Sequence, residues 1–158
     1  MKVEDSTVLF KKGIKNKYPL FDLMDHPVAM SHSVHWTIDN RIELNGYDVL
    51  KRSESIHLVF YWKLLQPEEK DVNLFIDFID EKGRSIDRQS RPLCYRIWPT
   101  QAWQKGQFIV EHQYISIPPG LIGRLRSLKV GFFNFNTGKL IRTDSKDPLG
   151  RINLDLAR

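Results

Sequence analysis

The sequence contains one cysteine, lacks long apolar runs and carries no recognisable catalytic motif. With Cys94 alone, neither an internal disulfide nor a zinc site built from several thiolates can form. No apolar run approaches the length of a membrane span, and residues 1–6 lack the apolar core of a signal peptide. A nucleophile elbow, a P-loop and a dinucleotide fingerprint are also missing. We therefore expect no catalytic residues, no metal and no cofactor, and we do not expect an enzyme.

The length of the chain is ordinary for one folded unit. Its 158 residues can bury a substantial core, and its composition is that of a globular protein. Two interpretations stay open: a complete intracellular protein, or a piece of a longer protein whose membrane-spanning part lies elsewhere. In either case we expect no membrane insertion by this chain.

Positive charge is the property that is present in excess, with a net charge of +5. Residues 120–142 hold five cations and no acid, and residues 82–105 hold six cations against Asp87 alone. Such segments suit nucleic acid, an anionic glycan or lipid headgroups. The alternative is a solvated face with counterions, which we favour. The cations are Arg124, Arg126, Lys129, Lys139 and Arg142 in the first segment, and Lys82, Arg84, Arg88, Arg91, Arg96 and Lys105 in the second.

Apolar and polar residues alternate along most of the chain after Trp36, which predicts strands and no long helix. The clearest example is residues 54–66, and an imperfect period around Gly46 predicts a bulge. About eight short strands with turn signals predict an all-β fold, an antiparallel β-sandwich of jelly-roll or immunoglobulin-like type. The expected strands are residues 41–50, 54–66, 72–80, 84–89, 107–117, 124–135, 139–143 and 151–157.

The first part of the chain lacks this pattern. Residues 1–34 read as an N-terminal arm or linker, and residues 35–158 as the β-sandwich domain. Several acidic residues and histidines occur early in the chain, but their spacing fits no metal motif. They are Asp22, Asp25, His26, His32 and His35.

A long loop over residues 90–105 carries the candidate binding residues Tyr95, Arg96, Trp98 and Trp103. Aromatic rings can stack on the apolar faces of sugars, so these residues could bind a glycan. The alternative is that the rings close the end of the core, which we favour for Trp103. Tyr95, Arg96 and Trp98 are then the part of the loop left for function.

Two pairs of a histidine and an acidic residue could act as an acid and a base if strand geometry brought them together. Neighbours on a strand point to opposite faces, so His112 and Glu111 should not meet. His57 and Asp77 could meet if the register places them opposite each other. We favour a structural, hydrogen-bonded role for each of these groups.

The order of several motifs resembles the β-sandwich domain appended, outside the membrane, to bacterial multi-spanning glycosyltransferase-like membrane proteins. The similarity covers roughly residues 38–143, and its most specific parts are the strand with Tyr61 and Trp62 and the loop with Pro99, Thr100 and Trp103. The motifs are residues 42–48, 58–67, 74–80, Gly83, Pro99, Thr100, Trp103, Gly106, Tyr114, Ile117, Pro118, 130–132, Thr137 and Gly138.

This resemblance implies a non-catalytic module that binds carbohydrate or supports a glycan-handling partner. It also implies a location at the extracytoplasmic face of the bacterial envelope if the chain is part of a membrane protein, and a cytoplasmic one if the chain is complete. A protein-interaction or structural module, using a sheet edge or the N-terminal arm, is the alternative. Nucleic-acid binding through residues 120–142 ranks third.

Overall fold

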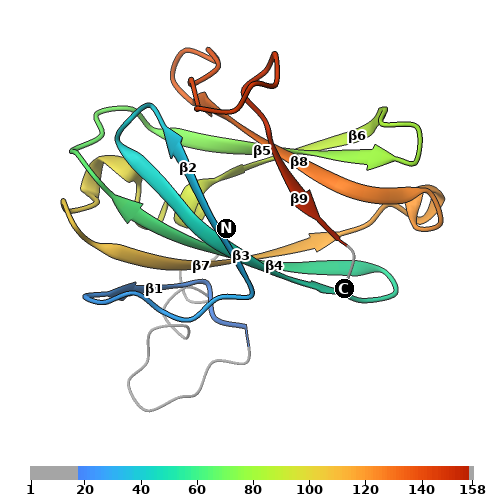
Figure 1. The fold of residues 1–158 in the computed structure, drawn as a ribbon, viewed down its shortest axis with the longest axis horizontal. Helices are drawn as coiled ribbons and strands as arrows, with labels where there is room; N and C mark the ends of the chain where they lie inside the picture. The colour runs from blue at the N-terminus through green and yellow to red at the C-terminus, as the bar shows by residue number, and fades with distance from the viewer. Residues whose placement is uncertain (1–17, 157–158) are drawn as a thin grey trace, which may run out of the picture.

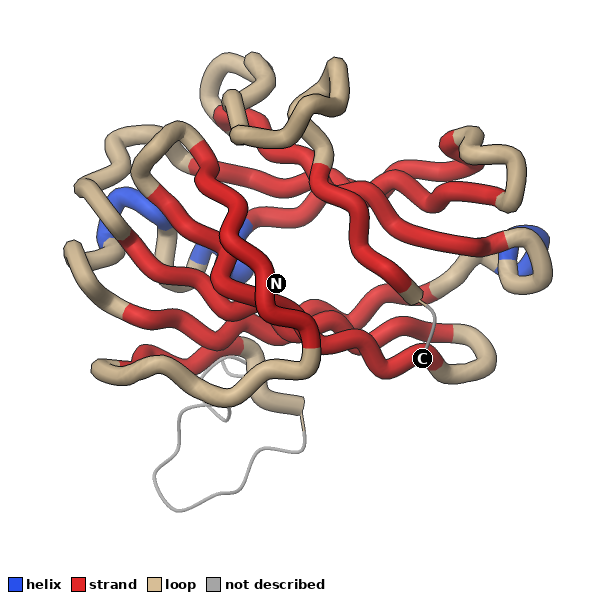
Figure 2. The backbone as a smooth tube through the Cα atoms, in the orientation of Figure 1, coloured by secondary structure: helices blue, strands red, loops and turns tan. Residues whose placement is uncertain are grey.

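The computed structural model describes residues 18–156, which form two antiparallel β-sheets packed face to face (Figure 1). The first sheet has the strand order β1-β7-β4-β3-β2 and the second the order β6-β5-β8-β9. Helical structure is confined to short 3-10 turns in loops (Figure 2). The predicted all-β sandwich is thus confirmed. The strands are β1 (Phe21–Met24), β2 (His32–Ile38), β3 (Ile42–Lys51), β4 (Ser55–Leu64), β5 (Val72–Asp80), β6 (Ser85–Pro92), β7 (Phe108–Ser116), β8 (Leu125–Asn134) and β9 (Ile152–Asp155); the turns are η1 (Leu93–Arg96), η2 (Thr100–Ala102) and η3 (Pro119–Leu121).

The connections follow the immunoglobulin-like alternative. The chain crosses between sheets after β4, after β6 and after β7, so β4 pairs with β7 in one sheet and β5 with β8 in the other. The order β3-β4-β7 against β6-β5-β8-β9 is that of an immunoglobulin-type sandwich. Strands β4 and β7 therefore lie side by side in the middle of the first sheet.

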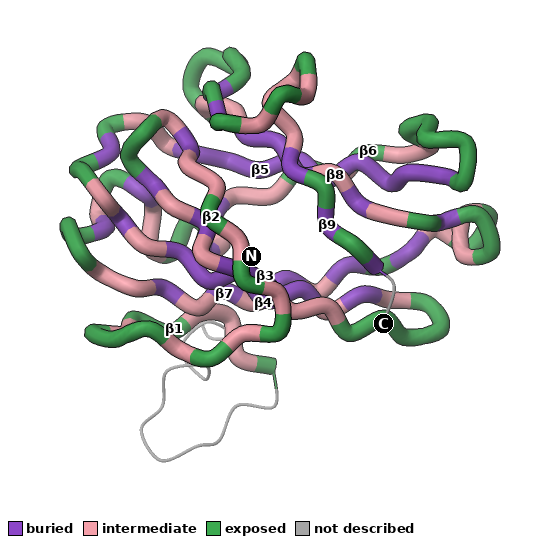
Figure 3. Tube along the Cα trace, in the orientation of Figure 1, coloured by how far each residue is buried: buried purple, intermediate pink, exposed green. Residues whose placement is uncertain are grey.

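The core lies between the sheets, where the inward faces of β4 and β5 meet (Figure 3). Each fully buried aliphatic or aromatic side chain contributes roughly 1.5–3 kcal/mol to folding. The alternating apolar residues of the two predicted strands form these inward faces. They are Ile56, Leu58, Phe60, Trp62 and Leu64 on β4, and Leu74, Ile76 and Phe78 on β5.

The described part of the expected N-terminal arm belongs to the first sheet. Strand β1 pairs with β7, where Phe21 lies opposite Glu111, and β2 pairs with β3. Four residues are too few to show a period, and β1 pairs with a strand some ninety positions away, so sequence pattern does not reveal it. Residues 1–17 lie outside the described residues.

The segment between β1 and β2 crosses the outer face of the first sheet, because these strands form its opposite edges (Figure 1). Gly46 permits the crossing. A Cβ there would lie 2.1 Å from Met30 Sδ and 2.4 Å from the His32 carbonyl oxygen. The register of β3 against β4 shifts between Leu44 and Gly46, as the sequence predicts for a bulge.

Two local sequence patterns have different outcomes. The run Asp80 to Gly83 has the residues of a tight turn, and Gly83 has a φ of +77° in the turn between β5 and β6. Residues 139–143 do not form the predicted strand. Leu140 makes only an isolated bridge with Phe133, because the chain leaves β8 after a few backbone hydrogen bonds.

Candidate functional site

Trp103 closes the end of the core, as favoured from the sequence. Its side chain is buried and its ring lies 6.4 Å from that of Trp62, centroid to centroid. Trp103 Nε1 donates a hydrogen bond of 3.0 Å to the Trp98 carbonyl oxygen. This tryptophan is therefore not available to stack on a ligand.

The other three candidates, Tyr95, Arg96 and Trp98, each make different contacts. Tyr95 is half-buried and its hydroxyl donates to the His112 carbonyl, while burial and the nearby Glu111 carboxyl raise the pKa of the Tyr95 phenol. Trp98 packs against the core. Arg96 is exposed, but its Nε lies 3.1 Å from an Asp71 carboxylate oxygen. The structure does not bring these residues together as one exposed stacking surface.

Beneath this loop lies a carboxyl group inside the sandwich. Glu111 is on the inward face of β7, fully buried, and accepts hydrogen bonds from Trp62 Nε1 at 2.9 Å and Gln113 Nε2 at 2.8 Å. The backbone N–H of Cys94 donates to the second carboxyl oxygen. Glu111 thus ties the loop to the middle of the first sheet.

The loop segment that Glu111 contacts, residues 94–96, forms an unusual turn. Cys94, Tyr95 and Arg96 have φ angles of +48°, +57° and +57°. The left-handed region costs a non-glycine residue about 1–2 kcal/mol, so the surrounding contacts must hold the turn. The hydrogen bond from Cys94 to Glu111 is one such contact.

Burial raises the pKa of Glu111 to about 7, and its three donors limit the rise by favouring the ionised form. A perturbed carboxyl is often catalytic. Glu111, however, faces the core and has no exposed surface, so it cannot reach a substrate. We assign it a structural role, which agrees with the interpretation favoured from the sequence.

On the outward face of β7, His112 meets a histidine of β4. His57 Nε2 and His112 Nδ1 lie 2.9 Å apart, close enough for one imidazole to donate to the other. Burial, followed by the positive charge of Arg52, lowers the pKa of His57, and burial, followed by His57, lowers that of His112. The pair is therefore predominantly neutral at neutral pH.

The expected alternative, His57 with Asp77, does not form. His57 is on the outer face of the first sheet, whereas Asp77 lies on β5, on the outer side of the second sheet, and binds Arg88 Nε at 2.5 Å. Arg151 Nη1 lies 2.9 Å from the other Asp77 oxygen. Burial alone would raise the pKa of Asp77, but these two guanidinium groups outweigh it and lower that pKa.

A third ring extends the histidine pair. Tyr114 lies directly opposite His57 in the β4–β7 register, and their rings stack with centroids 4.6 Å apart and planes 17° apart. Tyr18 meets Tyr114 edge-on at 5.8 Å. The Tyr114 hydroxyl donates a 2.8 Å hydrogen bond to the Pro19 carbonyl oxygen. Four aromatic rings therefore gather on the outer face of the first sheet.

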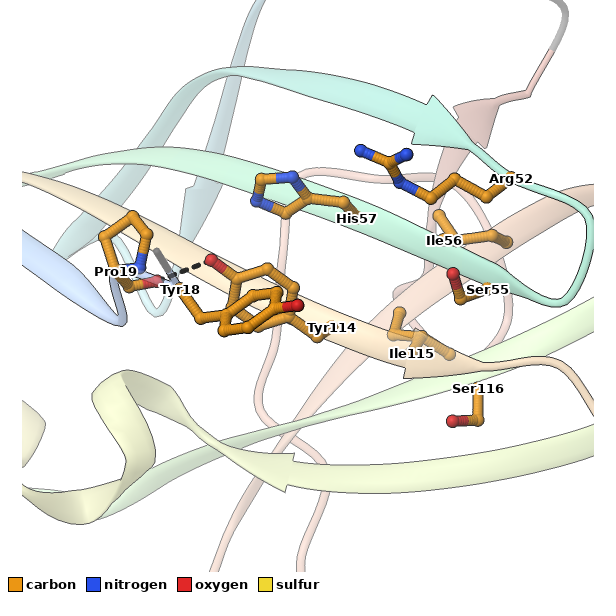
Figure 4. Close-up of a pocket in the computed structure, with 9 residues that line it drawn as sticks. All are labelled: Tyr18, Pro19, Arg52, Ser55, Ile56, His57, Tyr114, Ile115 and Ser116. Atoms are coloured by element: carbon orange, nitrogen blue, oxygen red, sulfur yellow. Dashed lines mark hydrogen bonds between the residues drawn. The ribbon is translucent and has the colours of Figure 1, made fainter. Parts of the chain in front are cut away.

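Three of these rings, those of Tyr18, His57 and Tyr114, border a depression of about 850 Å³, which opens on that face (Figure 4). Its walls come from the ends of β4 and β7, from the turn between β3 and β4, and from the segment before β1. In Figure 4 the Arg52 side chain extends toward the side of His57, and the rings of Tyr18 and Tyr114 overlap. The described lining residues are Tyr18, Pro19, Arg52, Ser55, Ile56, His57, Tyr114, Ile115 and Ser116.

Sequence pattern alone does not reveal this site. Its alternation placed His57 on one face of its strand and Tyr114 on one face of another, but only the register brings the two rings together. The one available signal was an aromatic or imidazole side chain at an outward position of each strand.

Just under half of the cations in the two basic segments have an acidic partner. Five of the eleven are in ion pairs within 4 Å, which fits the favoured interpretation of a solvated face with counterions. The pairs are Arg84 with Asp80, Arg88 with Asp77, Arg96 with Asp71, Arg126 with Glu81, and Lys129 with Asp147.

Within residues 18–156, no group of three or more histidine, cysteine or acidic side chains is placed to hold a metal ion. No helix in the same range is long and apolar enough to cross a membrane.

Comparisons with family models, with curated protein sequences and with solved structures gave no match. The resemblance noted in the sequence therefore stays a prediction, and the geometry of the outer face is the basis for a functional proposal.

Proposed function

We propose that this protein is a non-catalytic carbohydrate-binding module that holds a sugar ring in the outer-face depression. The observation that carries the proposal is the stack of His112, His57 and Tyr114, with Tyr18 at its edge. Sugar rings present apolar C–H faces that pack on aromatic rings, and hydroxyls that bond to imidazole nitrogens and serine hydroxyls. Ser55 and Ser116 supply such hydroxyls at the rim.

The stack of His112, His57 and Tyr114 is preorganised, which supports a binding role. Its three rings stand on β4 and β7 at the centre of the first sheet, and they stack on one another. A preformed surface loses little conformational entropy when a ligand binds. The depression is open, so we expect weak binding, with dissociation constants on the order of 0.1–1 mM.

The lining residues also support a module that does not hydrolyse its ligand. Glycoside hydrolysis generally requires a pair of carboxyl groups beside the scissile bond. The nine described lining residues include no aspartate or glutamate. The carboxyl with a pKa of about 7, Glu111, points to the opposite side of β7, into the core.

Calorimetric titration of a panel of neutral and acidic oligosaccharides tests the proposal. The Tyr114→Ala variant removes a stacking ring and should bind the preferred sugar about tenfold more weakly. Tyr114→Phe, which keeps the ring, should bind like the wild type. Phe135→Ala serves as a matched control, because Phe135 is an exposed aromatic of the loop after β8. Failure of the whole panel to bind, or full affinity in Tyr114→Ala, would contradict the proposal.

The resemblance suggests where the module acts. We propose that it works at the extracytoplasmic face of the bacterial envelope, beside or attached to a glycan-handling protein. Fractionation of cells that express the native gene would test this location. Recovery of the protein only in the cytoplasmic fraction would contradict it.

A protein-interaction module is the second candidate, and one observation favours it. Strand β6 (Ser85–Pro92) lies at the edge of the second sheet, where a strand of a partner could add. Light scattering across a range of protein concentrations would detect pairing between copies. A Gln89→Pro substitution at the edge should then abolish it, whereas a monomer at all concentrations would count against this edge as a self-association surface.

A further inference from the structure

We infer that the outer-face depression selects sugars that carry an anionic group, and that Arg52 is the residue that recognises this group. The inference rests on the proposed carbohydrate-binding function and adds the ligand class. Among the nine described lining residues, Arg52 alone carries a permanent charge. A depression with one cation and no carboxylate favours a ligand of opposite charge.

Arg52 differs from three arginines on or beside the second sheet, which have acidic partners. Arg88, Arg96 and Arg151 each lie within 3.2 Å of a carboxylate oxygen. Arg52 is exposed, and it has no carboxylate within ion-pair distance in the part of the chain that the structure describes. Its guanidinium is thus open to an external anion.

The position of Arg52 fits a ring that lies on the aromatic stack. Its backbone N–H bonds to the Ser55 carbonyl oxygen at 2.8 Å, which fixes the turn between β3 and β4. Arg52 and His57 line the same depression, and the positive charge of Arg52 helps to lower the pKa of His57, so the field of the guanidinium reaches this imidazole. A sugar stacked on His57 and Tyr114 would place a ring substituent within that field.

The planar shape of the Arg52 guanidinium indicates which anionic groups it can bind. A guanidinium is planar and binds carboxylate, phosphate or sulfate through two parallel N–H donors. Ser55 and Ser116 lie opposite each other at the ends of β4 and β7 and can bond to neutral ring hydroxyls. The expected ligand is therefore a hexose ring with one anionic substituent, which a uronic acid and a sugar phosphate represent in the test.

Calorimetry on the full chain distinguishes these sources with matched probes. The probes are an oligomer of galacturonic acid, the corresponding neutral galactose oligomer, glucose 6-phosphate, glucose, and inorganic phosphate. An exposed ion pair should strengthen binding of the charged sugar about fivefold over its neutral counterpart at low salt. This gain should shrink as salt is added. Gain with either charged sugar supports the inference and identifies the anionic group.

Variants assign the gain to Arg52. The Arg52→Gln variant should lose the fivefold preference and keep its affinity for the neutral oligomer, which also shows that the site is still folded. Arg142→Gln is the matched control, because Arg142 is an exposed arginine bonded through its carbonyl to the turn before β3, at the other end of that strand. It should retain the preference.

Each contrary result has a distinct meaning. Equal affinity for charged and neutral sugars would overturn the inference and leave the proposed function standing. A preference that survives in Arg52→Gln would also overturn it. Inorganic phosphate that binds as tightly as glucose 6-phosphate would overturn it by showing an anion site without ring recognition. No binding of any sugar would refute the proposed function itself.

Discussion

Replacing Glu111 by glutamine should change how the stability of the fold depends on pH. Glutamine has nearly the same shape but cannot ionise. It also cannot accept hydrogen bonds from both Trp62 Nε1 and the Cys94 N–H, because one side of an amide is a donor. The variant should therefore lose about 1–3 kcal/mol at a pH where Glu111 is protonated in the wild type.

The pKa of Glu111 gives the size and sign of the pH effect. Burial raises this pKa from 4.5 to about 7 in the folded protein. Between these values the folded state holds a proton that the unfolded state releases, so stability falls as pH rises. The raised pKa corresponds to a loss of ~3 kcal/mol that is complete above pH 7. Near pH 8, Glu111→Gln should therefore match or exceed the wild type in stability.

Other groups titrate in the same experiment, so the difference between proteins is the quantity to measure. His57 and His112 have lowered pKa values, and each makes stability rise with pH up to its unfolded value near 6.5. Asp147, whose pKa the Arg151 guanidinium lowers to about 2, acts only in acid. These contributions are common to both proteins and cancel in the difference.

Urea denaturation followed by tryptophan fluorescence gives the free energy of unfolding at pH values of about 4.5, 6 and 8. The wild type minus Glu111→Gln difference should fall by ~3 kcal/mol across this range. Glu54→Gln, which changes an exposed glutamate, is the control and should give a small, constant difference. A constant difference for Glu111→Gln would refute the claim that Glu111 is protonated in the folded protein below neutral pH.

Three further changes test the fold and the site. Gly46→Ala should lower the free energy of unfolding by about 1–3 kcal/mol, because the added Cβ would overlap Met30 Sδ and the backbone beside it. Gly120→Ala is the control. Gly120 has open space around it, so this change should be nearly neutral in the same denaturation assay. Asp77→Asn should lose about 1–3 kcal/mol of stability at neutral pH, because two guanidinium groups lose their carboxylate partner. This loss should shrink as the pH falls through the lowered pKa of Asp77. A loss that does not depend on pH would contradict this expectation. Tyr95→Phe should lower stability by about 1 kcal/mol and leave sugar affinity unchanged, and a loss of affinity by calorimetry would return the 93–103 loop to the binding site.

Much of the fold could be predicted because the central strands are buried on one or both faces. The alternation over residues 54–66 gave the inward face of β4, and the irregularity at Gly46 gave the bulge. Strand β1 could not be predicted, because its four residues are ordered by pairing with β7 and not by a period of their own. Tertiary pairing decides such short edge strands.

The candidate site was less predictable, for a related reason. Two tryptophans in a loop attract attention, but Trp103 is buried and Trp98 packs against the core. The outer-face depression arises from the register of β4 against β7, which places Tyr114 beside His57. Sequence periodicity gives the face on which a side chain lies, and the partner across the strand follows only from the pairing.

The central claim is that a sugar binds at the outer face of the first sheet. Nuclear magnetic resonance tests this claim most directly, by following the backbone and aromatic signals while an oligomer of galacturonic acid is added. The account predicts that the largest shifts fall on Arg52, His57 and Tyr114. Shifts confined to residues 95–98, or no shifts at high ligand concentration, would contradict it.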